Sequence, residues 1–360
     1  MSPEEKQHRR IALETELSFV RSTLEAAPMR LSFEGPLREL NERLAGLNAL
    51  GEQLARARAR GYVWGGDLEG QRGEVQRLAG PALELARGEI HRAANALRAR
   101  VDSANRSARA ISGDVFRNER AIQSLASDVR GLDNAIDAAE TKVRESTGLF
   151  ARAFDAMVGQ LKRIHETLDA FEQGSFKLQP EENPLAVIKA TWEDSPQGKK
   201  EGLLLLTAHR IRFEAIDEVV LERSLIFFAS RTEKRRTLLM DAPVGYLSGS
   251  DDSERGLIMK DQLLILTFRM ATGGFARCTF EVEEVSAKEA DSFLEQIRSG
   301  DLERQRYRGA MPTLSNVGVP VRWPESCNQC GARLEPPVRG QTYLTCAYCN
   351  AKHDVVLGEG

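Results

Sequence analysis

Four of the five cysteines form two Cys-x-x-Cys pairs near the C-terminus, Cys327/Cys330 and Cys346/Cys349, with 15 residues between the pairs. Each pair places two thiolates on one tight turn, and four thiolates complete the tetrahedral coordination that zinc prefers. Four protein ligands leave no open position for a substrate or an activated water. The sequence therefore predicts a structural site that holds one Zn²⁺ per chain, with these four cysteines as its ligands.

Two other chemistries can use cysteine pairs. The spacing also fits an iron site with four sulfur ligands, so zinc and iron both remain open. A redox centre needs a single pair in a βαβ context, and two matched pairs argue against it. His353 follows Cys349 by four residues and could act as a ligand. Because four cysteines already suffice, we expect His353 at the surface.

Short predicted strands precede each cysteine pair, and Gly331 follows the first pair. This arrangement resembles the zinc-ribbon family over residues 322–358, which implies a small module held together by its metal. Asn350 stands where many ribbons have glycine, and asparagine can adopt the same left-handed backbone. Residues 321–360 carry four basic and four acidic side chains. We therefore expect the ribbon to contact protein and do not expect it to bind nucleic acid.

Residues 185–299 consist of short apolar runs between polar turns, which predicts a meander of about seven strands. We expect the acidic stretch 241–255 to be a flexible insertion. Ser286 and Glu289 form a capping box that predicts a closing helix. The predicted strands are 187–192, 203–207, 210–214, 224–229, 237–240, 262–268 and 277–282.

The run 202–213, GLLLLTAHRIRF, is similar to a hairpin of GRAM and bacterial pleckstrin-homology-like (PH-like) domains. The similarity covers 185–299 and implies a small β-barrel, capped by its C-terminal helix, that binds lipid headgroups or protein segments. A basic stretch that we predict to be a loop could contact an anionic headgroup. The module as a whole has 16 basic and 19 acidic residues, so a solvated loop is the alternative. The residues of this basic stretch are Arg231, Lys234, Arg235 and Arg236.

The N-terminal half, residues 3–173, is rich in Ala, Leu, Arg and Glu and has apolar residues at helical spacing. We predict one helix that ends before Pro28, a second over 35–61, and a third over 75–111 with a kink at Pro81. The fourth pattern, 122–171, would span about 75 Å if unbroken, although its apolar seam shifts near Ser146. These helices predict a coiled coil or bundle, in the form of an elongated antiparallel hairpin or a plain bundle, with self-association through this arm. The turn 62–67 should pack its aromatic side chains on the bundle.

The fold class is therefore multi-domain α+β. The predicted domains are a helical coiled coil or bundle (3–173), a linker (174–184), a PH/GRAM-like domain (185–299), a linker (300–321) and a zinc ribbon (322–358). No apolar run approaches the ~18 residues of a membrane span, and the acidic N-terminus differs from a secretory signal. These features, with free cysteines typical of a reducing compartment, predict a cytoplasmic protein.

The sequence has no phosphate loop, dinucleotide fingerprint or hydrolase motif, and its five histidines are scattered, so we expect no enzyme. We predict a non-catalytic scaffold or adaptor that binds protein partners through the PH-like domain and the ribbon. The first alternative is a peripheral membrane remodelling or stress protein, in which the long helix and the stretch from Arg231 to Arg236 contact anionic lipid. The second is nucleic-acid binding through the ribbon, which the neutral charge of residues 321–360 disfavours.

Overall fold

The computed structural model describes residues 2–357 apart from 180–181, 224–229, 257–260, 273–274, 284, 308 and 310–320. The chain divides into two compact units. The first comprises Met1–Glu52 and Glu69–Gly159, and the second comprises Gln53–Leu68 and Gln160–Gly360. Within the described residues, no helix is both long and apolar enough to cross a membrane.

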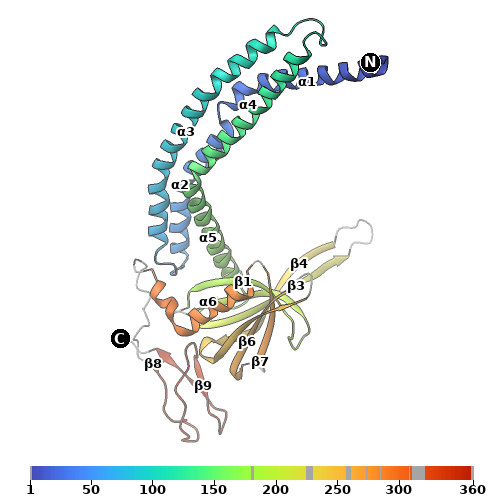
Figure 1. Cartoon of the computed structure of the whole chain (residues 1–360). Coiled ribbons are helices and arrows are strands. Elements are labelled where there is room, and N and C mark those ends of the chain that lie inside the picture. The colour runs from blue at the N-terminus through green and yellow to red at the C-terminus, as the bar shows by residue number, and fades with distance from the viewer. Residues whose placement is uncertain are drawn as a thin grey trace. The chain divides into compact units, whose positions relative to one another are not determined.

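The N-terminal half is helical, as predicted (Figure 1). In the first unit, α1 and α4 run in the same direction. Arg9 pairs with Glu119 near the starts of the two helices, and Arg30 pairs with Asp133 farther along both. Along the chain, α3 connects the end of α2 back to the start of α4 and runs in the opposite direction. The unit is therefore a bundle and not a two-helix hairpin. The five helices are α1 (Pro3–Arg30), α2 (Glu34–Ala59), α3 (Leu68–Ala110), α4 (Glu119–Ser146) and α5 (Gly148–Glu172).

Two helix boundaries differ from the prediction. Helix α1 continues past Pro28, whereas α3 contains Pro81 within its length, as the predicted third helix does. The expected 50-residue helix is interrupted at Thr147, between α4 and α5. There the hydroxyls of Ser146 and Thr147 donate to the carbonyl oxygens of Val143 and Arg144, at 2.7 and 3.0 Å. Such side-chain bonds offer the backbone an alternative to the helical ladder, and they coincide with the shift of the apolar seam.

The second unit contains a seven-stranded antiparallel sheet of order β4-β3-β2-β1-β7-β6-β5 (Figure 1). The expected barrel is not closed, because no pairing joins β4 to β5 among the described residues. The acidic stretch expected to be flexible forms β5, and the basic stretch expected in a loop lies in β4. The strand predicted at 224–229 falls outside the described residues. The strands are β1 (Pro184–Trp192), β2 (Lys200–Thr207), β3 (Arg210–Arg223), β4 (Ser230–Pro243), β5 (Leu247–Arg255), β6 (Asp261–Thr272) and β7 (Phe275–Val282).

One face of this sheet forms the main core with α6 (Ala287–Ser299). The capping box is confirmed, since Ser286 accepts from the N–H of Glu289 while the Glu289 carboxylate accepts from the N–H of Ser286. Trp192 lies at the centre of the core, with its ring 5.5 Å from those of Phe213 and Phe280. The order of strands and the closing helix agree with the predicted PH-like module.

The turn between α2 and α3 completes this core. Val63 and Trp64 are buried among the sheet residues, and Trp64 Nε1 donates to the carbonyl oxygen of Pro184 at 3.0 Å. The expectation that these aromatics pack on the helical bundle was therefore wrong. The same turn contacts the segment after α6, where the N–H of Tyr307 donates to the carbonyl oxygen of Val63 at 2.7 Å.

The opposite face of the sheet is covered by the end of α5 and by the described part of the segment predicted as a linker, residues 174–179 and 182–184. Phe171 packs on Leu205, and Phe176 lies against the same cluster. Beside it, Arg212 is 1% exposed and binds both carboxylate oxygens of Glu182, at 2.9 and 2.8 Å. The segment therefore contributes a buried ion pair to the sheet.

Candidate metal centre

The two cysteine turns have the same backbone geometry. In each, the N–H of the fifth residue, Gly331 or Asn350, donates to the carbonyl oxygen of the first cysteine, at 2.8 and 2.9 Å. The N–H of that first cysteine, Cys327 or Cys346, donates to the carbonyl oxygen of the sixth residue, at 2.7 and 2.9 Å. Gly331 and Asn350 have φ of 74° and 59°, which confirms that Asn350 takes the place of a glycine.

Short strands position these turns. The strand β9 (Tyr343–Thr345) leads into the second pair and returns as β10 (Lys352–Asp354), while β8 (Val321–Arg322) pairs with β11 (Val356–Leu357). Leu344 and His353 face each other in the β9–β10 register and both are buried. Alternation along these strands leaves Tyr343 and Lys352 exposed.

The structure brings the four predicted ligands together. Their Sγ atoms all lie within 4.8 Å of one another. The Sγ atoms of Cys327 and Cys349 are 3.5 Å apart, as are those of Cys330 and Cys346. Zn–S bonds of ~2.3 Å in a tetrahedron place sulfurs about 3.8 Å apart. The four thiols therefore fit around one metal ion, and an ion bound there would join the two turns.

Hydrogen bonds favour the thiolate at the buried end of the site. Burial alone would raise the pKa of Cys327, but backbone N–H groups of Cys330 and Gln329 and the side chains of Cys349 and His353 lower that pKa to about 6. The first cysteine of the second pair also has a lowered pKa, chiefly because of backbone N–H groups. The pKa values of Cys330 and Cys349 are raised, in part by their hydrogen bonds to the other thiols. Metals bind the deprotonated form, so the backbone N–H groups favour ligation at the first cysteine of each pair.

His353 is a residue that sequence reasoning placed wrongly. It is 7% exposed and not at the surface, and its Nε2 lies 3.2 Å from Cys327 Sγ. Because a thiolate only accepts hydrogen bonds, Nε2 carries a proton when it contacts the charged sulfur. His353 therefore supports a ligand from outside the four-sulfur set. Its burial follows from the pairing of β10 with β9, where it lies opposite the apolar Leu344, and the local sequence carries no signal for that pairing.

Of the four basic residues predicted to contact an anion, the three whose side chains are described do not converge on a free surface. Lys234 and Arg235 lie opposite Glu218 and Asp217 in the β3–β4 register. Arg236 donates at 3.0 Å to the carbonyl oxygen of Ala170 and at 3.0 Å to Gln173 Oε1, both at the end of α5. The side chain of Arg231 is outside the described residues.

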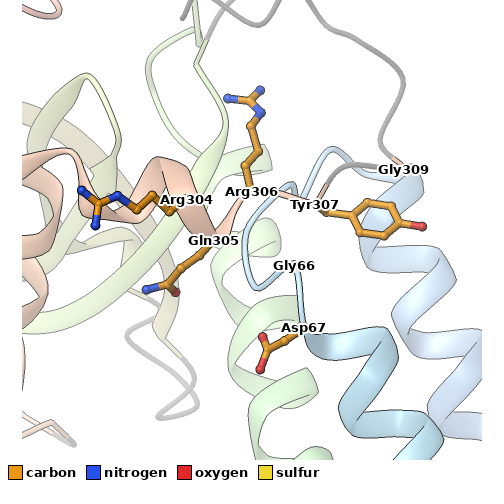
Figure 2. A pocket seen from close by; sticks show the side chains of 7 residues that line it. All are labelled: Gly66, Asp67, Arg304, Gln305, Arg306, Tyr307 and Gly309. Atoms are coloured by element: carbon orange, nitrogen blue, oxygen red, sulfur yellow. The ribbon is translucent and has the colours of Figure 1, made fainter.

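A hollow of about 640 Å³ lies beside the α2–α3 turn and the segment after α6 (Figure 2). Its lining includes Arg304, Arg306 and Asp67. Figure 2 shows Arg304 and Arg306 pointing in different directions, and each pairs with an acid three residues earlier on its own segment. The charged groups therefore do not gather on one ligand position.

A second feature that sequence reasoning missed is the loop between the cysteine pairs. Residues 336–341 lie against the sheet module, and the N–H of Gly245 donates to the carbonyl oxygen of Arg339 at 3.1 Å. Two prolines and Gly340 mark this loop as a turn in the sequence, but they do not indicate what it contacts. The loop that joins the two cysteine turns thus contacts the sheet.

Comparisons with known proteins find no matching family model and no matching curated protein. Among solved structures, the Vps36 N-terminal PH domain is 14% identical, with 35% of this chain and 86% of that chain covered and a TM-score of 0.23. The hSac2 domain from human phosphoinositide phosphatase Sac2 is 13% identical, with 42% and 81% covered and a TM-score of 0.21. The DH/PH domains of p115-RhoGEF are 14% identical, with 83% and 95% covered and a TM-score of 0.23.

Within this chain, the strand order β4-β3-β2-β1-β7-β6-β5 and the closing of the core by α6 agree with a PH-like module.

Proposed function

We propose that this protein is a non-catalytic cytoplasmic adaptor that binds protein partners through its PH-like module and its zinc ribbon. The helical arm assembles the protein with itself or with a partner. Four thiolates fill the coordination sphere of the ion, so the zinc supplies stability and shape to the ribbon and takes no part in a reaction.

The observation that carries this proposal is the exposure of two tyrosines of the ribbon. Tyr348 is 81% exposed at the tip of the second cysteine turn, and Tyr343 is 47% exposed on β9. Lys352 Nζ lies 4.8 Å from the centroid of the Tyr343 ring. Tyrosines on a rigid support bury large area at a small cost in side-chain entropy, and they are enriched where proteins bind one another.

Affinity purification of the full chain from its native cells tests the proposal when it is done in parallel with the Tyr343→Ser/Tyr348→Ser variant. We expect the variant to lose specific partners while it keeps one zinc per chain. Thr345→Ser is the matched control, because it changes another exposed residue of β9 and leaves the aromatics in place. If all three proteins retain the same partners, this face is not the contact surface.

A further inference from the structure

The loop 336–341, which we call the ribbon loop, contacts three parts of the sheet module. These parts are the β2–β3 turn, the 3₁₀ turn η1 (Val244–Tyr246) and the end of α6. Arg210 Nη1 donates to the carbonyl oxygen of Gly340 at 2.7 Å, and the N–H of Gly245 donates to the carbonyl oxygen of Arg339 at 3.1 Å. Both bonds are made to backbone carbonyl oxygens of the loop and fix its position.

The side chain of Arg339 enters the same surface. Its Nη1 donates to the carbonyl oxygen of Ile297, in the last turn of α6, at 3.0 Å. Its Nη2 lies 3.3 Å from Glu303 Oε1. The C-terminal end of a helix carries partial negative charge, so the helix end and the carboxylate together form a site for a cation. This arrangement selects a basic side chain at this position of the loop.

Glycines on both sides allow the close approach. Gly340 has φ of 80°, and a Cβ on it would overlap the carbonyl oxygen of His209. A Cβ on Gly245 would lie 2.6 Å from the Cβ of Val338. Backbone atoms cannot move aside as a flexible side chain can. The surface therefore requires glycine directly after the arginine.

The ribbon loop is also ordered by its own contacts. The N–H of Gln341 donates to the carbonyl oxygen of Val338 at 3.0 Å, which closes a four-residue turn. The N–H of Val338 donates in return to Gln341 Oε1 at 3.0 Å. Gly340 occupies the third position, where a type II turn needs positive φ. A turn that is already ordered loses little entropy when it binds.

We propose that this surface of the sheet module is a recognition site for β-turns that contain Arg-Gly, and that the ribbon loop occupies it as an internal ligand. A partner protein that presents an Arg-Gly turn binds there when the ribbon loop leaves. Tethering holds the loop at an effective concentration of about millimolar, so it excludes weaker external ligands. The inference rests on the proposed function, because it names the class of protein segment that the PH-like module binds. It concerns a different surface from the exposed tyrosines, so the two are tested separately.

A labelled cyclic peptide of residues 335–342 tests this site by fluorescence polarisation with the full zinc-loaded chain. The Gly340→Val substitution forces the ribbon loop off the surface and leaves the cysteine turns intact. We expect this variant to bind the peptide at least ~10-fold more tightly than the wild type, because the internal competitor is gone. Adding Arg210→Ala to the variant should abolish the binding.

Gly198→Val is the matched control, since Gly198 also has positive φ, at 84°, but has open space around it. This control should bind the peptide as weakly as the wild type does. If Gly340→Val does not fold, Arg339→Ala frees the same surface by removing the cation. Equal affinity for the wild type and the freed variant, or no binding to either, would overturn the proposal.

Discussion

The sheet module and the ribbon lie in one unit but are stabilised by different means. The sheet encloses a large core that includes Trp192, Phe213 and Phe280, together with the buried face of α6. Among the described residues, the apolar cluster of the ribbon has four buried members, and two of them, Cys327 and Cys346, are predicted metal ligands. A core of that size cannot offset the loss of conformational entropy on folding. We therefore expect the fold of the ribbon to depend on a bound ion and the fold of the sheet module not to.

Removing the metal should show the difference in stability between the ribbon and the sheet module most clearly. With a strong chelator, the ribbon should lose the ~10–16 kcal/mol that a structural zinc supplies, and β9 and β10 should exchange their amide hydrogens rapidly. In the same hydrogen-exchange experiment, strands β1–β3 of the sheet module should remain protected. Metal analysis should find one zinc per chain before chelation.

Cys346→Ser should reproduce this loss of the ribbon without a chelator. Cys278→Ala, which changes the buried cysteine of the sheet, should leave the zinc content unchanged. Loss of protection in the sheet upon chelation would contradict the separation of the two modules, and iron in the purified protein would replace zinc in our assignment.

The second expected effect concerns the sheet alone. Arg212→Met leaves the Glu182 carboxylate buried without its partner, so we expect the free energy of unfolding to fall by about 3–5 kcal/mol in urea titrations. Arg235→Met, on the exposed side of β4, should change it by less than ~0.5 kcal/mol. The double variant Arg212→Met/Glu182→Gln should recover part of the loss. Zinc affinity should not change in any of these variants.

A smaller effect should follow from the buried histidine of the ribbon. His353→Phe removes the N–H that Cys327 accepts, and we expect a 10–100-fold loss of zinc affinity in competition with a chromophoric chelator. His353→Gln keeps a donor and should retain most of the affinity. Asp354→Asn, at the exposed neighbouring position, is the control. A normal affinity in the Phe variant would mean that His353 only fills space.

The smallest effect should appear where the ribbon loop meets the sheet. Burial, and then the charge of Arg339, lowers the pKa of His209 below 6.5, although Glu303 and Glu182 act in the opposite direction. The folded state therefore favours neutral His209, and this contribution to stability is complete above pH 6.5 and is lost as the pH falls through the lowered value. We expect the amides of residues 338–341 to lose protection against exchange at acidic pH. This loss of protection should be absent in His209→Gln. An identical pH dependence in both proteins would exclude His209 as the cause.

The features that the sequence predicts well are those that depend on neighbours in the chain. A Cys-x-x-Cys turn is complete within six residues, so both cysteine turns and the left-handed Asn350 could be predicted. The capping box at Ser286 is equally local. Helices α4 and α5 follow an apolar repeat, and only their boundary at Thr147 depends on side-chain bonds to the backbone.

The features that the sequence predicts poorly depend on pairing between distant segments. The acidic residues of β5 lie on an edge strand with solvent on one side, so their composition resembles that of a loop. The burial of His353 follows from the pairing of β10 with β9, and the role of Arg236 follows from the position of the end of α5. Nothing in the local sequence specifies these partners.

Trp64 has a consequence for how this protein is made and divided. Its bond to Pro184 joins positions 120 residues apart, so the core of the sheet module includes a piece that is synthesised long before the first strand. During translation, Trp64 of the α2–α3 turn cannot be buried until strands β1–β7 have been synthesised and have folded. A fragment that begins at residue 184 would leave a vacancy in that core. The smallest part of the chain that folds as a cooperative whole is therefore discontinuous along the polypeptide.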